Sequence, residues 1–142
     1  MKTSRPVVHL LGYAGLIPFV LPVLLVYLGL PQAELARGAA EIYAFGIVSF
    51  LCGSWWGLSL RDDAPKAFWL SNLYFLFALF VFLFASAWWP LAAAVILSSL
   101  LFAEHSNGLF NPFPPHYRKL RIQLTAIAAA SMLPLQLYPV DG

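Results

Sequence analysis

Long apolar stretches separated by short polar connections dominate the chain. The pattern predicts five helices, at about residues 7–30, 42–60, 67–87, 90–105 and 117–138. The second stretch holds 19 residues without a charge, and at about 1.5 Å per residue it reaches the roughly 30 Å of a bilayer's hydrocarbon core. The sequence therefore predicts an all-α integral membrane protein, a bundle of five transmembrane helices that forms a single domain over residues 1–142.

Two prolines interrupt the first stretch. Pro18 and Pro22 lie one turn apart, and because proline has no amide donor they should kink or loosen the helix midway. A carbonyl freed inside a bilayer needs a new donor from protein or water. Two interpretations stay open, a structural kink against the small residues Gly12, Ala14 and Gly15, and a broken helix that frames a ligand site.

The second stretch carries four small residues on one narrow face, because an α-helix turns about 100° per residue. They are Gly46, Ser49, Gly53 and Gly57. Such a stripe lets two membrane helices approach closely. We therefore expect this helix at the centre of the bundle, packed through the stripe on the first helix at Gly12 and Gly15, since consecutive spans are usually neighbours.

Trp55 lies well away from the centre of this stripe. Close contacts across the stripe would be lost if a larger residue forced the helices apart. Replacement of Trp55 by Leu should therefore loosen the bundle less than replacement of Gly53 or Gly57 by Leu.

The amino-acid composition supports a membrane protein and argues against several other classes of protein. With 61% hydrophobic and 10% charged residues, a chain of this size cannot hide its apolar side chains in a water-soluble core. A net charge of +2 does not suggest a nucleic-acid partner. The single Cys52 excludes an intrachain disulfide and a cysteine cluster, and we expect it to be a small packing residue.

Basic residues gather on one side of the five-span arrangement. That side receives Lys2, Arg5, Arg61, Lys66, Arg118, Lys119 and Arg121, whereas the other receives Arg37. By the positive-inside rule the N-terminus should face the cytoplasm and the C-terminus the periplasm. The expected location is the bacterial inner (plasma) membrane, with the mitochondrial inner membrane as the alternative.

Polar residues collect near the same face. The candidate polar site comprises His9, Asn72, Glu104, His105, His116, Arg118 and Arg121. The three histidines have no spacing typical of metal ligands within a helix, so we expect no tight triad and predict no metal, cofactor or catalytic residue. We expect these side chains to bond backbone, water and lipid headgroups, with Asn72 making an interhelical hydrogen bond or, alternatively, a substrate contact. The basic run at 117–121 should anchor the topology and meet anionic lipid.

Three stretches together resemble a known family. They are LGYAGLIPF (Leu11 to Phe19), the residues Tyr43, Phe50, Gly53, Trp56 and Gly57, and YRKLRIQLT (Tyr117 to Thr125). Their order and spacing are similar to an uncharacterised five-helix family of small inner-membrane proteins, a domain of unknown function with bacterial members and a mitochondrial transmembrane relative. The resemblance implies the five-helix fold and no established activity, cofactor or catalytic residue.

Three hypotheses for function follow. The first is a non-enzymatic scaffold or assembly partner, because the bundle has small-residue stripes and no chemical motif; its partners would be membrane lipids with other membrane proteins or a second copy. The second is a binding or permeation module for a lipid, quinone or small solute, indicated by Pro18, Pro22 and Asn72. The third, a membrane enzyme or redox protein that uses the histidines, would require a bound metal or haem.

Overall fold

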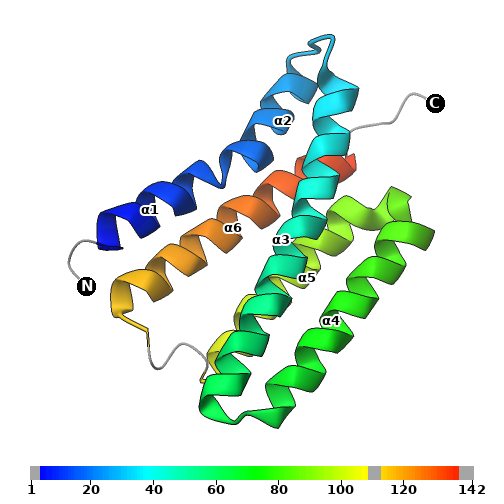
Figure 1. Cartoon of the computed structure of the whole chain (residues 1–142). Helices are drawn as coiled ribbons and strands as arrows, with labels where there is room; N and C mark the ends of the chain where they lie inside the picture. The colour runs from blue at the N-terminus through cyan, green and yellow to red at the C-terminus, as the bar shows by residue number, and fades with distance from the viewer. Residues whose placement is uncertain (1–3, 109–112, 138–142) are drawn as a thin grey trace.

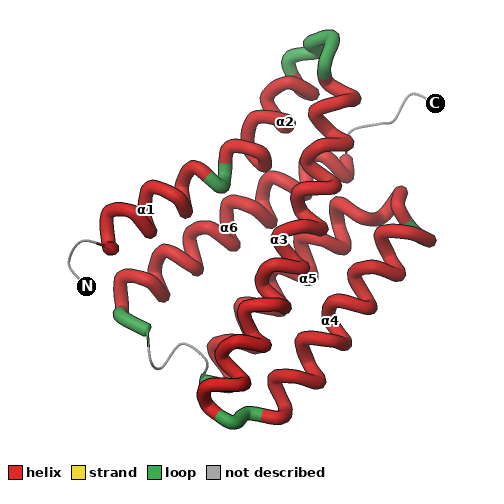
Figure 2. Tube along the Cα trace, viewed as in Figure 1, coloured by secondary structure: helices red, strands yellow, loops and turns green. Residues whose placement is uncertain are grey.

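The chain folds as a helical bundle (Figures 1 and 2). The computed structural model describes residues 4–108 and 113–137. The helices are α1 (Ser4–Ala14), α2 (Ile17–Tyr27), α3 (Ala33–Asp62), α4 (Pro65–Phe84), the short 3₁₀ helix η1 (Ser86–Trp88), α5 (Trp89–Ser106) and α6 (Pro115–Leu137). The described ranges contain five helical spans long and apolar enough to cross a membrane, which confirms the predicted class. Lys2 and the predicted end of the last helix at Tyr138 lie outside the described residues.

The helices pack in two overlapping groups, one around α3 and one around α6, and both groups include α2 and α5 (Figure 1). Helix α3 contacts α2, α4 and α5, and α6 contacts α1, α2 and α5. Helix α5 likewise contacts α3, α4 and α6, so α3 shares the interior of the bundle with α5 and α6. Successive spans reverse direction. The start of α1, the turn between α3 and α4, and the start of α6 therefore belong to one end of the bundle, named here the basic end because Arg61, Lys66, Arg118 and Lys119 lie there.

The second span is longer than predicted. Helix α3 has 30 residues and starts at Ala33, whereas the sequence pattern places its start at residue 42 and a polar connector before it. Alanine is the strongest helix former, and four alanines between residues 33 and 40 carry the helix through the charged positions. The Arg37 guanidinium pairs with the Glu41 carboxylate at 3.2 Å, one turn along the same helix. Charge alone was therefore a poor marker of the helix start.

The first span is broken in two, as its prolines predict. The break falls at Gly15 and Leu16, just before Pro18 in the first turn of α2. The amide of Phe19 donates to the Leu16 carbonyl at 3.0 Å, and the Tyr43 hydroxyl of α3 donates to the Gly15 carbonyl at 2.9 Å. The new donor that a freed carbonyl needs in a bilayer thus comes from a neighbouring helix. Pro22 lies inside α2 without ending it.

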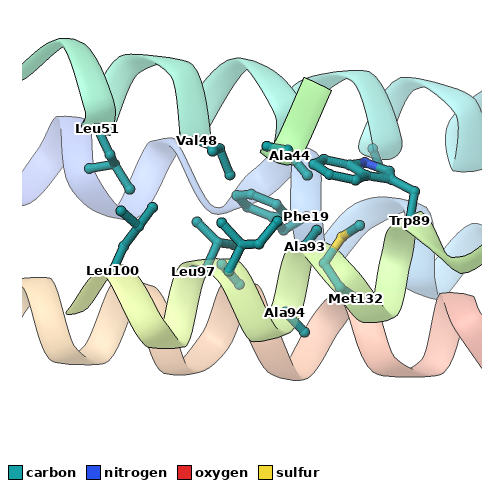
Figure 3. Packing of buried hydrophobic residues seen from close by; sticks show 14 of the residues in the cluster. Phe19, Ala44, Val48, Leu51, Trp89, Ala93, Ala94, Leu97, Leu100 and Met132 are labelled. Atoms are coloured by element: carbon teal, nitrogen blue, oxygen red, sulfur yellow. The ribbon is translucent and has the colours of Figure 1, made fainter. Parts of the chain in front are cut away.

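The core lies between α2, α3, α5 and α6 (Figure 3). The alanines Ala44 and Ala93 lie at one end of the contact between α3 and α5. Larger side chains fill the rest of it: Val48 and Leu51 of α3 face Leu97 and Leu100 of α5, with Phe19 and Met132 completing the layer. Trp89 is fully buried and its indole N–H donates to the Glu41 carbonyl at 2.8 Å, whereas Trp88 is exposed. Of the Trp88–Trp89 pair, only Trp88 therefore has the exposure typical of an interfacial tryptophan.

The prediction that the α3 stripe packs on another helix of this chain is wrong. A β-carbon built at Gly46, Gly53 or Gly57 meets no atom of a neighbouring helix within 4 Å among the described residues. Ser49 is half-buried, and its hydroxyl donates to the Phe45 carbonyl within α3. The buried face of α3 is a different one, formed by Ala40, Ala44, Val48, Leu51, Cys52, Trp55 and Ser59. Both faces are apolar, and the sequence pattern could not distinguish a face toward lipid from a face toward protein.

The two glycines of the first span have other neighbours than expected. A β-carbon at Gly12 would lie 3.2 Å from Leu124 Cδ1, so Gly12 lets α1 approach α6 rather than α3. A β-carbon at Gly15 would lie 3.3 Å from the Gly12 carbonyl oxygen and 3.5 Å from the Tyr43 hydroxyl. Gly15 thus does face α3, but through the Tyr43 side chain one turn before Gly46 and not through the stripe.

Candidate functional site

Glu104 is the most deeply buried carboxylate among the described residues. It lies in α5, two residues before the helix ends at Ser106, and is 3% exposed. It follows Leu97 and Leu100 along the same face of α5, since residues three, four and seven apart align on a helix. The face that builds the core therefore also carries Glu104 into the bundle.

Three helices meet at this carboxylate, and the group Trp55, Glu104, Arg121 and Thr125 is called the Glu104 cluster below. The Trp55 indole N–H of α3 donates to Glu104 Oε1 at 2.8 Å. Arg121 Nη2 of α6 donates to the same oxygen at 3.2 Å, and Arg121 Nη1 donates to Thr125 Oγ1 at 2.8 Å. The cluster links α3, α5 and α6 near the basic end.

The electrostatics of the cluster are those of an ion pair in an apolar setting. The side chains of Arg121 and Glu104 are 10% and 5% exposed, so both charges have lost most of their contact with solvent. Such charges are expensive inside a membrane protein unless they are paired and hydrogen-bonded. Glu104 Oε1 has two donors, but Oε2 is buried and no donor among the described residues reaches it. An unsatisfied buried carboxylate oxygen indicates that a further hydrogen-bond donor belongs here.

A cavity of about 340 Å³ opens beside this carboxylate. Its walls come from α3, α5 and α6 and from Phe113, which precedes α6; among them are Ser54, Gly57, Glu104, Tyr117 and Arg121. Gly57 leaves room here because it has no side chain. Apart from the cluster and a few hydroxyls the lining is apolar, which is the usual composition of a small-molecule site.

A second cavity of about 420 Å³ lies between α1, α2, α3 and α6. It is bordered by Gly12, Gly15 and Tyr43 at the break in the first span, and by Thr125 of the cluster. Phe50, Leu51, Tyr117 and Arg121 line both cavities. The Arg121 side chain thus stands between two apolar spaces, with its charge held by Glu104.

The structure brings together part of the predicted polar site. Glu104 and Arg121 are joined directly. His9 of α1 and His116 of α6 stack with ring centroids 5.7 Å apart, and His9 Nε2 is buried without a hydrogen-bond partner among the described residues. These two pairs hold α1, α5 and α6 together at the basic end.

The remaining predicted residues lie elsewhere. His105 and Arg118 line a separate groove on the outside of α5 and α6. Asn72 is exposed and donates to the Phe68 carbonyl one turn earlier in α4 at 2.8 Å. The expected interhelical hydrogen bond from Asn72 is not formed with any residue that the structure describes. Within the described ranges, no three His, Cys, Asp or Glu side chains are grouped as metal ligands would be.

Trp55 and Thr125 belong to the cluster but were absent from the predicted site. Thr125 follows Arg121 by one turn on α6, and that spacing alone predicts contact on a helix surface. Trp55 offered a weaker signal: an indole N–H inside a membrane span needs an acceptor, but the sequence does not say which of the acceptors on neighbouring helices it meets.

Comparisons with known proteins identify a family and a relative of the chain, and neither description states an activity. A family model described as "Protein of unknown function (DUF3429)" matches residues 4–137. Transmembrane protein 69 of Xenopus tropicalis is 32% identical over 135 residues, which are 91% of this chain and 53% of that protein. The chain therefore spans about half the length of this relative. No solved structure matches. These matches confirm the resemblance inferred from the sequence.

Proposed function

The chain belongs to the DUF3429 family of proteins of unknown function, and from that premise we propose that it is a non-enzymatic membrane protein that binds a small amphipathic molecule at the Glu104 cluster. The class of ligand is a lipid, a quinone in its quinol form or another small solute with a hydroxyl or amine group. Its polar group donates to Glu104 Oε2, and its apolar part lies in the cavities on either side of Arg121.

The observation that carries the proposal is the unpaired oxygen of a buried carboxylate at the wall of a cavity. Glu104 Oε2 has no donor among the described residues, and Glu104 lines the 340 Å³ space. A hydrogen bond to a charged group contributes about 1.5–3 kcal/mol, enough to fix the orientation of a weakly held membrane molecule. The apolar walls supply the remaining affinity by excluding water.

The test is native mass spectrometry of the protein released directly from membranes into mild detergent. We expect wild-type protein to carry a small molecule that Gly57→Leu excludes, because Leu at this position fills the cavity. Gly46→Leu is the matched control: it makes the same change on the same helix, at a glycine that lines neither cavity. Occupancy unchanged in Gly57→Leu would contradict the proposal.

A second variant examines the polar contact. Glu104→Gln keeps the shape of the side chain but removes its charge, and we expect bound ligand to fall by about tenfold. Glu34→Gln, at the exposed start of α3, is the matched control and should keep full occupancy. Equal ligand occupancy in both variants would show that Glu104 does not contribute to the binding site.

A second candidate function is that of a scaffold or assembly partner. It is favoured by the outward direction of Gly46 and Gly53, because a bare helix surface toward lipid gains little unless another helix packs on it. Cysteine cross-linking tests it: Gly53→Cys in a Cys52→Ala background should cross-link to a partner or a second copy. Phe80→Cys, exposed on α4, should not. Equal cross-linking at both sites would reject a specific interface.

The proposed orientation has the basic end in the cytoplasm of a bacterium and the C-terminus in the periplasm. The basic residues at the turns of this end support it, because they favour retention on the cytoplasmic side. A reporter active only in the periplasm should be active after Gly142 and inactive after Pro65. The reverse pattern would overturn this orientation.

A further inference from the structure

A groove of about 570 Å³ runs along the outside of the bundle between α5 and α6. Helix α5 contributes Ser98, Leu101, Phe102 and His105, and α6 contributes Pro115, Arg118, Lys119 and Ile122. Each set follows the spacing i, i+3, i+4, i+7, so each is one continuous stripe of its helix. Two antiparallel stripes thus form the two walls.

The groove is apolar along most of its length and basic at one end. His105 lies one residue before the end of α5, and Arg118 and Lys119 lie in the first turns of α6, so their side chains belong to the same end of the groove. Phe102 is 72% exposed and Ile122 51% exposed, which means that the apolar part opens sideways toward the surroundings of the bundle.

The basic residues at this end of the groove are available to bind an anion. Neither Arg118 nor Lys119 forms an ion pair with any residue that the structure describes. Arg118 Nε is buried and finds no hydrogen-bond acceptor within the described ranges. None of the eight described residues that line the groove is acidic, and the nearby Glu104 is engaged by Trp55 and Arg121.

We propose that this groove is a binding site for an anionic phospholipid of the surrounding leaflet. The acyl chains lie along Leu101, Phe102 and Ile122, and the phosphate accepts hydrogen bonds from Arg118 and Lys119. Three properties select this occupant: the groove opens sideways into the bilayer, its basic end lies at the helix ends where headgroups are found, and its charge is complementary to a phosphate. None of its described lining residues borders the cavities at Glu104, so the site is separate from the proposed ligand site.

Native mass spectrometry with titrated lipid tests the proposal, using phosphatidylglycerol and phosphatidylcholine of identical acyl chains. We expect wild-type protein to retain phosphatidylglycerol at least tenfold more tightly than phosphatidylcholine. The double variant Arg118→Gln/Lys119→Gln should weaken phosphatidylglycerol binding by about 10- to 30-fold, because each basic residue near a charged lipid surface contributes about fivefold.

The matched control is Arg61→Gln/Lys66→Gln, which removes the same charge at the same end of the bundle but outside the groove. It should change the affinity by less than about twofold. A loss equal to that of the groove variant would show general attraction to basic residues and would overturn the proposal. Equal retention of both lipids by wild-type protein would also overturn it, as would displacement of phosphatidylglycerol by millimolar inorganic phosphate.

A third variant tests the apolar part without altering charge. Ser98→Phe fills the end of the groove that lies farthest from His105. It should weaken binding of both lipids while leaving the preference for phosphatidylglycerol intact. Circular dichroism of each variant verifies the helical fold. Unchanged binding in Ser98→Phe would contradict occupancy of the groove by acyl chains.

Discussion

The two faces of α3 differ in what they contact more than in how apolar they are. One face, with Ala44, Val48 and Trp55, is fully buried against α2, α4 and α5. The other, with Gly46 and Gly53, has open space where a side chain would begin. Burial follows the face whose larger side chains interlock with neighbours and whose indole finds an acceptor. Small side chains permit a neighbouring helix to approach closely, but they do not by themselves cause a helix to pack on the glycine face of α3.

The Trp55 indole is central to this difference. An N–H group without an acceptor costs several kcal/mol in hydrocarbon, and Glu104 supplies the acceptor at 2.8 Å. Turning α3 to bury its glycines would separate these two groups. The rotation of α3 is thus set in part by one hydrogen bond to α5.

The largest expected effect comes from Trp55→Ala. Removing a fully buried tryptophan costs about 3–5 kcal/mol, and the variant also takes one of two donors from Glu104. Detergent unfolding followed by circular dichroism gives the difference. Trp56→Ala is the control at the next position, where the ring is 45% exposed, and it should cost less than about 1.5 kcal/mol. Equal losses in the two variants would mean that the two faces contribute alike.

A smaller effect is expected from overpacking the buried face. Ala44 is fully buried, and Ala44→Leu should destabilise the bundle by about 1–3 kcal/mol because the added atoms have no free space. Ala39→Leu, an exposed site on the same helix, should change the unfolding midpoint little. A tolerant Ala44 would indicate a loosely packed contact between α3 and α5.

The smallest effect is expected at the stripe itself. Gly53→Leu should leave the isolated chain unchanged or stabilise it by up to about 1 kcal/mol, since glycine is a poor helix former. Unfolding midpoints measured at low protein concentration test this. A marked loss that appears only at high concentration would show that a second copy packs on the stripe, and a loss at every concentration would contradict the exposed position of Gly53.

The number and type of spans could be predicted because length and apolarity decide them directly. The start of α3 could not, since alanine-rich helix continued through Glu34 and Arg37. The buried face was also out of reach, because lipid and protein interiors are both apolar and hydrophobic periodicity carries little information about rotation. The earlier expectation that Trp55 matters less than Gly53 therefore conflicts with the burial of Trp55.

The sequence could predict which residues belong to the candidate site better than it could predict which of them pair with each other. Glu104 and Arg121 lie within two turns of the same connection on consecutive helices, a signal that they share a depth. Whether they meet depends on how α5 and α6 rotate against each other, which the core decides. In the same way, Pro18 predicts a disturbed hydrogen-bond pattern in the first span, but the choice of Tyr43 as the donor to the Gly15 carbonyl depends on the tertiary fold.

The break at Gly15 also affects how the first span can match the thickness of a bilayer. A straight helix changes its hydrophobic length across the membrane only by tilting as a whole, at a cost for each ångström of mismatch. Here α2 is anchored to α3 and α6, whereas α1 packs chiefly on α6. Because α1 and α2 are separate helices, the tilt of α1 is not fixed by the packing of α2 on α3. We expect a change in membrane thickness to alter the contact of α1 with α6 before it alters the core.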